Sequence, residues 1–197
     1  MSNIATIKGT EKVKLISMLA FMSSVAPLAT DMYLPALPNV SKSFEVDDFY
    51  AQLSLASFFV AFALGQLIYG PLSDIFGCKK PLYIGIMLFI VSSFGCMIID
   101  SIYAFIVLRF FQALGGCAGV VIARAIVNDK FNLQEAAGVF ALMMVVSSLA
   151  PMLAPSIGAI LLEFFSWKSI FFILFLFGIG IFLSIIFLLE ENIPNTK

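Results

Sequence analysis

Six long apolar segments constrain the fold of this chain more than any other feature. A helix needs about 20 mainly apolar residues to cross the hydrocarbon core of a bilayer, which is about 30 Å thick. The segments that meet this requirement are residues 15–38, 51–72, 81–99, 102–123, 136–162 and 170–189. They predict an all-α integral membrane protein with six transmembrane helices.

The composition agrees with a lipid environment and excludes several functions. Charged residues make up 12% of the 197 residues, whereas about a quarter is usual in soluble domains. The chain contains no His, which excludes imidazole metal sites and His-based acid–base catalysis. No basic patch could hold a phosphate backbone, so we expect no nucleic-acid partner. Neither a G-x-S-x-G motif nor paired intramembrane aspartates occur, and we expect no enzyme, metal or bound cofactor.

The placement of lysine and arginine predicts the orientation of the spans, because positive charge accumulates in short cytoplasmic loops. An amino terminus inside the cell makes most of these residues cytoplasmic and leaves only Lys42 and Lys168 outside. The cytoplasmic set is Lys8, Lys12, Lys14, Lys79, Lys80, Arg124, Lys130 and Lys197. We therefore expect both termini in the cytoplasm.

The chain divides into one membrane domain with short flanking pieces. Residues 1–14 are predicted to be a cytoplasmic amino-terminal segment, residues 15–189 the six-span bundle, and residues 190–197 the start of a cytoplasmic loop or tail. Six spans form two groups of three with opposite directions in the membrane, which is the arrangement of inverted-repeat transporter halves. We detect no internal sequence identity, so the predicted repeat is one of topology.

Two opposite charges lie inside the predicted spans. Asp31 is about seven residues from the outer end of the first segment, and Arg109 is seven residues into the fourth, so each lies roughly 10 Å below the outer surface. We expect them to meet as an ion pair. Because a carboxylate inside a membrane costs about 2.5–3.5 kcal/mol and usually marks an ion or substrate pathway, we predict a role in proton coupling. A static pair that only fixes helix packing is the alternative.

Polar side chains near these charges predict a cavity between the first and fourth spans. Ser17, Ser24 and Asp31 recur every seven residues and so share one face of a helix, as do Arg109 and Gln112 on the fourth span. The residues predicted to line a substrate cavity are Ser24, Asp31, Tyr33, Arg109 and Gln112.

The loop between the second and third spans reads Gly-Pro-Leu-Ser-Asp-Ile-Phe-Gly-Cys-Lys-Lys over residues 70–80. It resembles the cytoplasmic loop motif of the major facilitator superfamily. The resemblance rests on Gly70, Asp74, Gly77, Lys79 and Lys80. Arginines usually stand in this motif where the chain has Ile75 and Cys78, and the resemblance therefore implies a weakened conformational latch.

Three further stretches resemble the Bcr/CflA drug-resistance branch of that superfamily. They are Ala-Thr-Asp-Met-Tyr-Leu-Pro-Ala-Leu-Pro at 29–38, Arg-Phe-Phe-Gln-Ala-Leu-Gly at 109–115 and Ala-Arg-Ala-Ile-Val-Asn-Asp at 123–129. The resemblance implies efflux of small amphipathic, drug-like compounds across the cytoplasmic (inner) membrane in exchange for protons. The proton gradient would then be the energy source, and no cofactor is expected.

The fifth span contains a motif that resembles the one marking antiporters in this superfamily, at residues 150–158. Pro151, Pro155 and Gly158 share one face, and each proline removes a helix hydrogen bond and favours a bend. The resemblance implies an antiporter gate, whereas on physical grounds alone a kink that merely fits its neighbours is an equal alternative.

Length is the largest departure from the family, whose members carry twelve spans. The two halves of such transporters enclose the substrate site between them. We therefore expect this chain to need a second six-helix half or a homodimer partner. The alternative is a truncated, inactive half-transporter or an assembly subunit with no transport activity of its own.

Overall fold

The computed structural model describes residues 9–192, and every regular element in that range is helical. The long helices are α1 (Gly9–Asp31), α3 (Asp48–Phe76), α4 (Lys79–Ile98), α5 (Ile102–Lys130), α6 (Leu133–Phe164) and α7 (Lys168–Asn192), and a short 3-10 helix η1 (Leu34–Ala36) and α2 (Leu37–Ser43) follow α1. Six helical spans in the described range are long and apolar enough to cross a membrane, with α1, η1 and α2 counted as one. The predicted fold class is confirmed.

Local sequence explains where several helices begin and end. Asp47 caps α3 by accepting a hydrogen bond from the backbone N–H of Phe49 at 2.8 Å, and Asn132 caps α6 by accepting one from Glu135 at 2.9 Å. Such caps satisfy backbone donors that have no partner within the helix. α3 ends at Gly77, whose φ of +76° lies in the region that favours glycine.

The first span runs over Lys12–Ser43 and includes the predicted residues 15–38, but it is not one continuous helix. α1 ends at Asp31, and the chain continues through η1 and α2. Pro35 and Pro38 lie in the first turns of these two short helices, where a missing N–H is tolerated, but neither could continue the hydrogen bonding of α1. Asp31 therefore sits at a break in the span.

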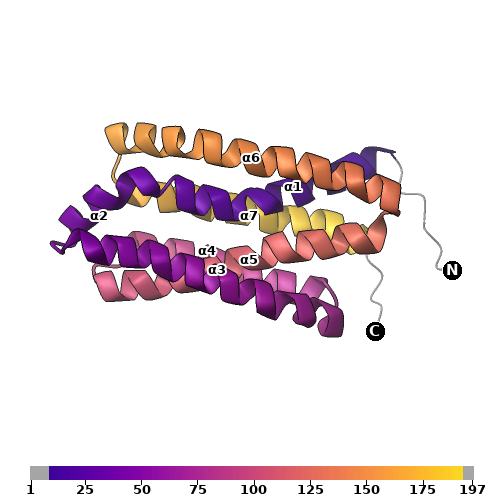
Figure 1. The fold of residues 1–197 in the computed structure, drawn as a ribbon, viewed down its shortest axis with the longest axis horizontal. Helices are drawn as coiled ribbons and strands as arrows, with labels where there is room; N and C mark the ends of the chain where they lie inside the picture. The colour runs from indigo at the N-terminus through magenta and orange to yellow at the C-terminus, as the bar shows by residue number, and fades with distance from the viewer. Residues whose placement is uncertain (1–8, 193–197) are drawn as a thin grey trace.

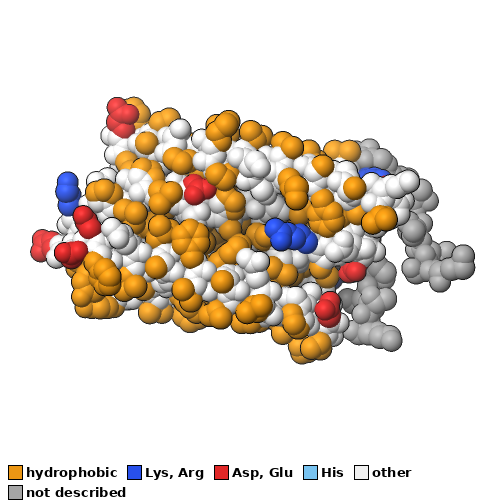
Figure 2. Space-filling model, in the orientation of Figure 1, with side chains coloured by type: hydrophobic (Ala, Val, Ile, Leu, Met, Phe, Trp, Pro, Cys, Tyr) orange, Lys and Arg blue, Asp and Glu red, His pale blue; other side chains and the backbone are white. Residues whose placement is uncertain are grey.

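The helices run along the long axis of the molecule, with α1 and α5 at its centre (Figure 1). α5 packs against α3, α4 and α1, whereas α1 packs against α5, α6 and α7. α3 and α6 are the flanking helices and bury the least of their surface among the spans. Figure 2 shows apolar side chains over much of one face, with an acidic and a basic side chain interrupting it away from the ends.

Close backbone approach joins α4 to α5. A Cβ on Gly115 would meet the backbone of Gly85 and Phe89, and a Cβ on Gly85 would meet the side chain of Ala118. Glycine is therefore required at this crossing, as is usual where membrane helices approach closely.

The predicted division of the chain stays a prediction. α1 begins at Gly9, inside the predicted cytoplasmic segment 1–14, and residues 1–8 lie outside the described range. α7 continues to Asn192, beyond the predicted limit at 189, and residues 193–197 of the predicted tail also lie outside it. The predicted orientation in the membrane stays a prediction.

Candidate substrate cavity

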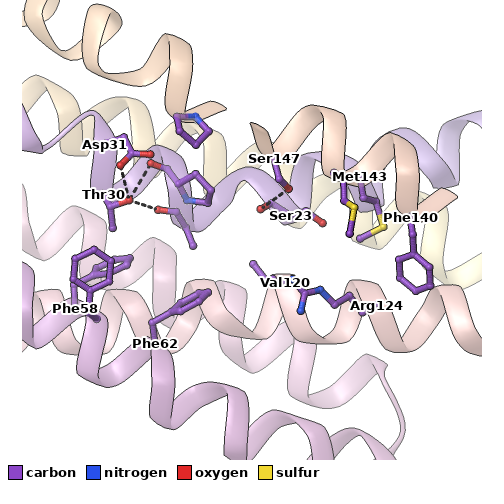
Figure 3. Close-up of a pocket in the computed structure, with 15 residues that line it drawn as sticks. Ser23, Thr30, Asp31, Phe58, Phe62, Val120, Arg124, Phe140, Met143 and Ser147 are labelled. Atoms are coloured by element: carbon purple, nitrogen blue, oxygen red, sulfur yellow. Dashed lines mark hydrogen bonds between the residues drawn. The ribbon is translucent and has the colours of Figure 1, made fainter. Parts of the chain in front are cut away.

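A cavity of about 630 Å³ lies among α1, α3, α5 and α6 (Figure 3). This size is within the range of about 300–1,000 Å³ that is usual for small-molecule sites. Its walls are mainly aromatic and apolar, with a few polar groups. The lining residues are Ser23, Ala26, Pro27, Thr30, Asp31, Phe58, Phe59, Phe62, Val120, Arg124, Phe140, Met143, Met144, Ser147 and Pro151.

Asp31 reaches this cavity from the last position of α1 and is half-buried. The Thr30 hydroxyl lies 3.3 Å from Asp31 Oδ1 and 3.1 Å from the carbonyl oxygens of Ala26 and Pro27, so one proton is shared among three acceptors. Within the described part of the chain, no lysine or arginine lies at ion-pair distance from Asp31. Its carboxylate faces the cavity without a counter-ion.

Pro27 shapes the neighbouring part of the wall. A proline inside a helix cannot donate to the carbonyl four residues earlier, which here belongs to Ser23. The Ser147 hydroxyl of α6 lies 3.4 Å from that Ser23 oxygen and donates to it instead. A defect in α1 thus creates a polar contact between α1 and α6 on the cavity surface, visible in Figure 3.

Arg109 does not pair with Asp31, so the predicted ion pair is wrong. Arg109 is fully buried, and its Nη1 donates to the carbonyl oxygen of Ala29 at 3.2 Å and to Gln112 Oε1 at 2.7 Å. The contact with Ala29 places Arg109 at nearly the same level along the first span as Asp31, as residue counting led us to expect. Ala29 and Asp31 are two positions apart, however, and so point to opposite faces of the helix. Depth was predictable from residue counting, whereas rotation about the helix axis was not.

Aromatic rings surround the Arg109 guanidinium. Its central carbon lies 4.5 Å from the ring centroids of Tyr33 and Phe58 and 5.6 Å from that of Phe171. Nε and Nη2 have no hydrogen-bond partner among the described residues. The faces of aromatic rings attract cations. Cation–π contact is therefore the interaction available to Nε and Nη2, which are buried away from water.

Four of the five residues predicted to line the cavity lie in the buried interior instead. Gln112 Nε2 donates to Ser93 Oγ at 2.8 Å, which extends the Arg109 network toward α4. The Tyr33 hydroxyl bonds to Ser54 Oγ at 2.7 Å, and Ser24 donates to the Phe21 carbonyl at 2.8 Å. Ser24, Tyr33, Arg109 and Gln112 are absent from the cavity wall, where Asp31 alone of the predicted set is found.

The sequence reasoning missed Arg124 and the aromatic wall. Arg124 was assigned to a cytoplasmic loop because the fourth span was expected to end at residue 123, but α5 continues to Lys130 and carries Arg124 along the cavity. Residues 124–130 contain neither glycine nor proline, which was a signal that the helix could continue. Nothing in the sequence separated cavity-facing phenylalanines from lipid-facing ones.

The loop motif lies at the far end of α3 and the start of α4. Gly77 makes the reversal between these helices, Asp74 is exposed one turn before it, and Lys79 and Lys80 begin α4. No described neighbour lies within 4 Å of the place where a Cβ on Gly70 would project.

Cys78 connects this motif to the end of α5. Its Sγ lies 3.9 Å from Asp129 Oδ2. Burial together with the carboxylates of Asp129 and Asp74 raises the pKa of the Cys78 thiol to about 11. A neutral thiol therefore occupies the place where the family motif usually has an arginine.

The proline motif of α6 lies on two different surfaces. Pro151 lines the cavity near Ser147. Gly158 instead packs on the break in α1, where an added Cβ would clash with the carbonyl oxygen of Met32. Pro155 is half-buried, and α6 stays helical through both prolines.

Comparison with known proteins gives the family. Residues 19–197 match the family described as the Major Facilitator Superfamily, and the chain belongs to this superfamily of membrane transporters. It is 39% identical over 191 residues to an MFS-type transporter, YdgK, of Bacillus subtilis, covering 96% of this chain and 48% of that protein. The predicted family is therefore confirmed.

Other relatives carry names that refer to drug resistance. A bicyclomycin resistance protein homolog of Haemophilus influenzae is 33% identical over 174 residues, covering 88% of this chain and 44% of that protein. Multidrug resistance protein MdtL of Escherichia coli is 29% identical over 168 residues, covering 85% of this chain and 43% of that protein. The resemblance to the drug-resistance branch is confirmed by these relatives. The chain spans about half the length of the curated relatives it matches.

Proposed function

We propose that this chain forms one six-helix half of a proton-coupled efflux transporter for small amphipathic compounds. Membership in a transporter superfamily and relatives named for resistance to drugs support the class of function. The observation that carries the proposal is Asp31, an acidic side chain that has no counter-ion among the described residues and lies on the wall of a largely apolar cavity of about 630 Å³.

Asp31 would carry the proton. A carboxyl group in a low-dielectric cavity changes its charge when it gains or loses a proton, and groups of this kind within a membrane serve as proton carriers in transporters. Asp31 also ends α1, so a change in its charge acts on the break between α1 and η1. Substrate and proton would compete, because both would occupy the same wall of the cavity.

Arg109 would influence this exchange from inside the bundle. It holds the carbonyl of Ala29, two residues before Asp31, and is held in turn by Gln112 of its own helix. A shift of α1 that changes the solvent access of Asp31 would therefore strain the contact between Ala29 and Arg109. The outward-open and inward-open states would then differ in the arrangement of this contact.

A second group of six helices would complete the site. α3 and α6 flank the cavity and are the least buried of the spans, so another set of helices packing on them would enclose it. The halves of such transporters hold the substrate between them. We propose that this partner is either a separate six-helix half or a second copy of this chain, with both termini in the cytoplasm.

The test is energised efflux of dansylamide, a neutral fluorescent aromatic compound, from cells that express the chain. The proposal expects efflux that collapses when a protonophore removes the proton gradient. It also expects Asp31→Asn to abolish efflux and Asp100→Asn to preserve it, because Asp100 is exposed and pairs with Lys168 away from the cavity. Efflux unaffected by Asp31→Asn, at equal expression, would contradict the proposed role of Asp31.

Efflux that appears only when a complementary six-helix half is co-expressed would identify the partner as a separate half, whereas efflux from cells that express this chain alone would identify it as a second copy of the chain.

A further inference from the structure

Arg124 is the one basic residue on the cavity wall among those described, and the proposed transport cycle gives it no role. It is exposed, and within the described range it forms no ion pair. It lies six residues before the end of α5 at Lys130, or about 9 Å inside the helix end at 1.5 Å per residue. Its charge is therefore carried by the helical wall of the cavity and not by the loop that follows α5.

The two charged groups of the cavity lie far apart. Asp31 and Ser23 are eight residues apart on α1, which corresponds to about 12 Å along the helix. Ser23 contacts Ser147 of α6, and Figure 3 shows Arg124 on the other side of this pair from Asp31. The cavity therefore has a negative end and a positive end.

Aromatic side chains fill the wall between and beside these ends. Phe58 and Phe62 project from α3 near Asp31, and Phe140 of α6 lies on the Arg124 side (Figure 3). An aromatic body placed over such rings is held by apolar contact and by ring stacking. Which polar or charged group a bound ligand can carry then depends on the charged residues at the two ends of the cavity.

We propose that Arg124 is a specificity-determining residue that binds the anionic group, a carboxylate or sulfonate, of aromatic amphiphiles. An arginine guanidinium presents a planar fork of donors that matches both groups. Charge-assisted hydrogen bonds of this kind are about twice as strong as neutral ones. The inference rests on the proposed function, because it takes the cavity to be the substrate site.

The test uses two probes that share one aromatic body and differ in charge. Dansylate carries a sulfonate, whereas dansylamide is its neutral counterpart. Both are titrated against the chain in nanodiscs of zwitterionic lipid, and the fluorescence of empty discs is subtracted. The variants are Arg124→Gln, Arg124→Lys and, as a control for loss of one positive charge on the same helix, Lys130→Gln, which lies outside the cavity lining.

We expect Arg124→Gln to weaken dansylate binding about tenfold while dansylamide binding stays within about twofold, since one charge-assisted contact is lost. Arg124→Lys should retain part of the preference, and Lys130→Gln should leave both affinities unchanged. The inference is overturned if Arg124→Gln weakens both probes equally, if dansylate binding does not change, or if the unmodified chain binds neither probe saturably. Charge-selective binding without any efflux, both from the chain alone and with a co-expressed six-helix half, would contradict the proposed function and leave this inference standing.

Discussion

Arg109 keeps a charge inside the bundle without a carboxylate. Carbonyl and amide oxygens satisfy Nη1, and the rings of Tyr33 and Phe58 cover the rest of the guanidinium. Removal of this side chain would leave a void between α1, α3 and α7 and would leave Gln112 Oε1 without its donor. The position therefore contributes to stability regardless of any role in transport.

Arg109→Ala should destabilise the protein by about 2 kcal/mol or more, from the unpaired acceptors and the void. Arg124→Ala is the matched control, because Arg124 is exposed, and surface changes of this kind stay within about 0.5 kcal/mol. The measurement is the thermal midpoint of each variant in the same detergent. Equal midpoints for the two variants would contradict the account of Arg109.

The pH dependence of thiol labelling at Cys78 tests the contact between the loop motif and Asp129. Its thiol has a pKa of about 11, so the reactive thiolate is scarce at neutral pH and its fraction rises about tenfold per pH unit up to that value. Replacing Asp129 with Asn removes a nearby negative charge, which lowers the pKa of Cys78 and should speed maleimide labelling several-fold at pH 8. The other two cysteines, Cys96 and Cys117, are buried and are replaced by alanine in the background. A labelling rate that does not respond to Asp129→Asn would contradict this assignment.

At the scale of single helices, α6 packs on α1 where the first span is broken. Gly158 meets the backbone of Met32 and the ring of Pro35, directly after Asp31. Packing against the break in α1 therefore explains why a glycine stands at this position of the predicted antiporter motif. The break lies beside the proposed proton carrier, Asp31. A change at this contact should reach Asp31 without altering the carboxylate itself.

Gly158→Ala should lower stability, because its Cβ would clash with a backbone oxygen that cannot move independently of α1. Gly138→Ala, on the same helix, is the control. Among the described residues, no atom outside its own helix backbone lies within 4 Å of a Cβ at that position, and alanine is favoured over glycine in a helix by about 1 kcal/mol. Opposite shifts in thermal midpoint are expected. A Gly158→Ala protein as stable as Gly138→Ala would show that the contact with α1 is looser than described.

The sequence predicted the number and type of the elements well, because a span requires an uninterrupted apolar segment of fixed length. It predicted the cavity poorly for a reason specific to α1. Ser17, Ser24 and Asp31 share a nominal face, yet Ser17 is exposed, Ser24 is buried and Asp31 is half-buried. Since α5, α6 and α7 surround α1, a polar stripe on this helix does not indicate which neighbour it faces.

At the scale of the whole molecule, α1, α3, α5 and α6 line one cavity. Asp31 and Arg124 lie toward its two ends, with aromatic side chains between and beside them. The chain covers less than half of each of the three relatives described above, and α3 and α6 leave much of their apolar surface uncovered. Enclosure of the cavity by a second set of helices is the arrangement that would remove this surface from lipid.

The central claim is that substrate and proton compete at Asp31. The most direct measurement is proton release when dansylamide binds to the purified protein in weakly buffered nanodiscs, followed with a pH indicator. We expect proton release from the unmodified chain and from Asp100→Asn, and none from Asp31→Asn at equal ligand occupancy. Release from Asp31→Asn as large as that from the unmodified chain would contradict it.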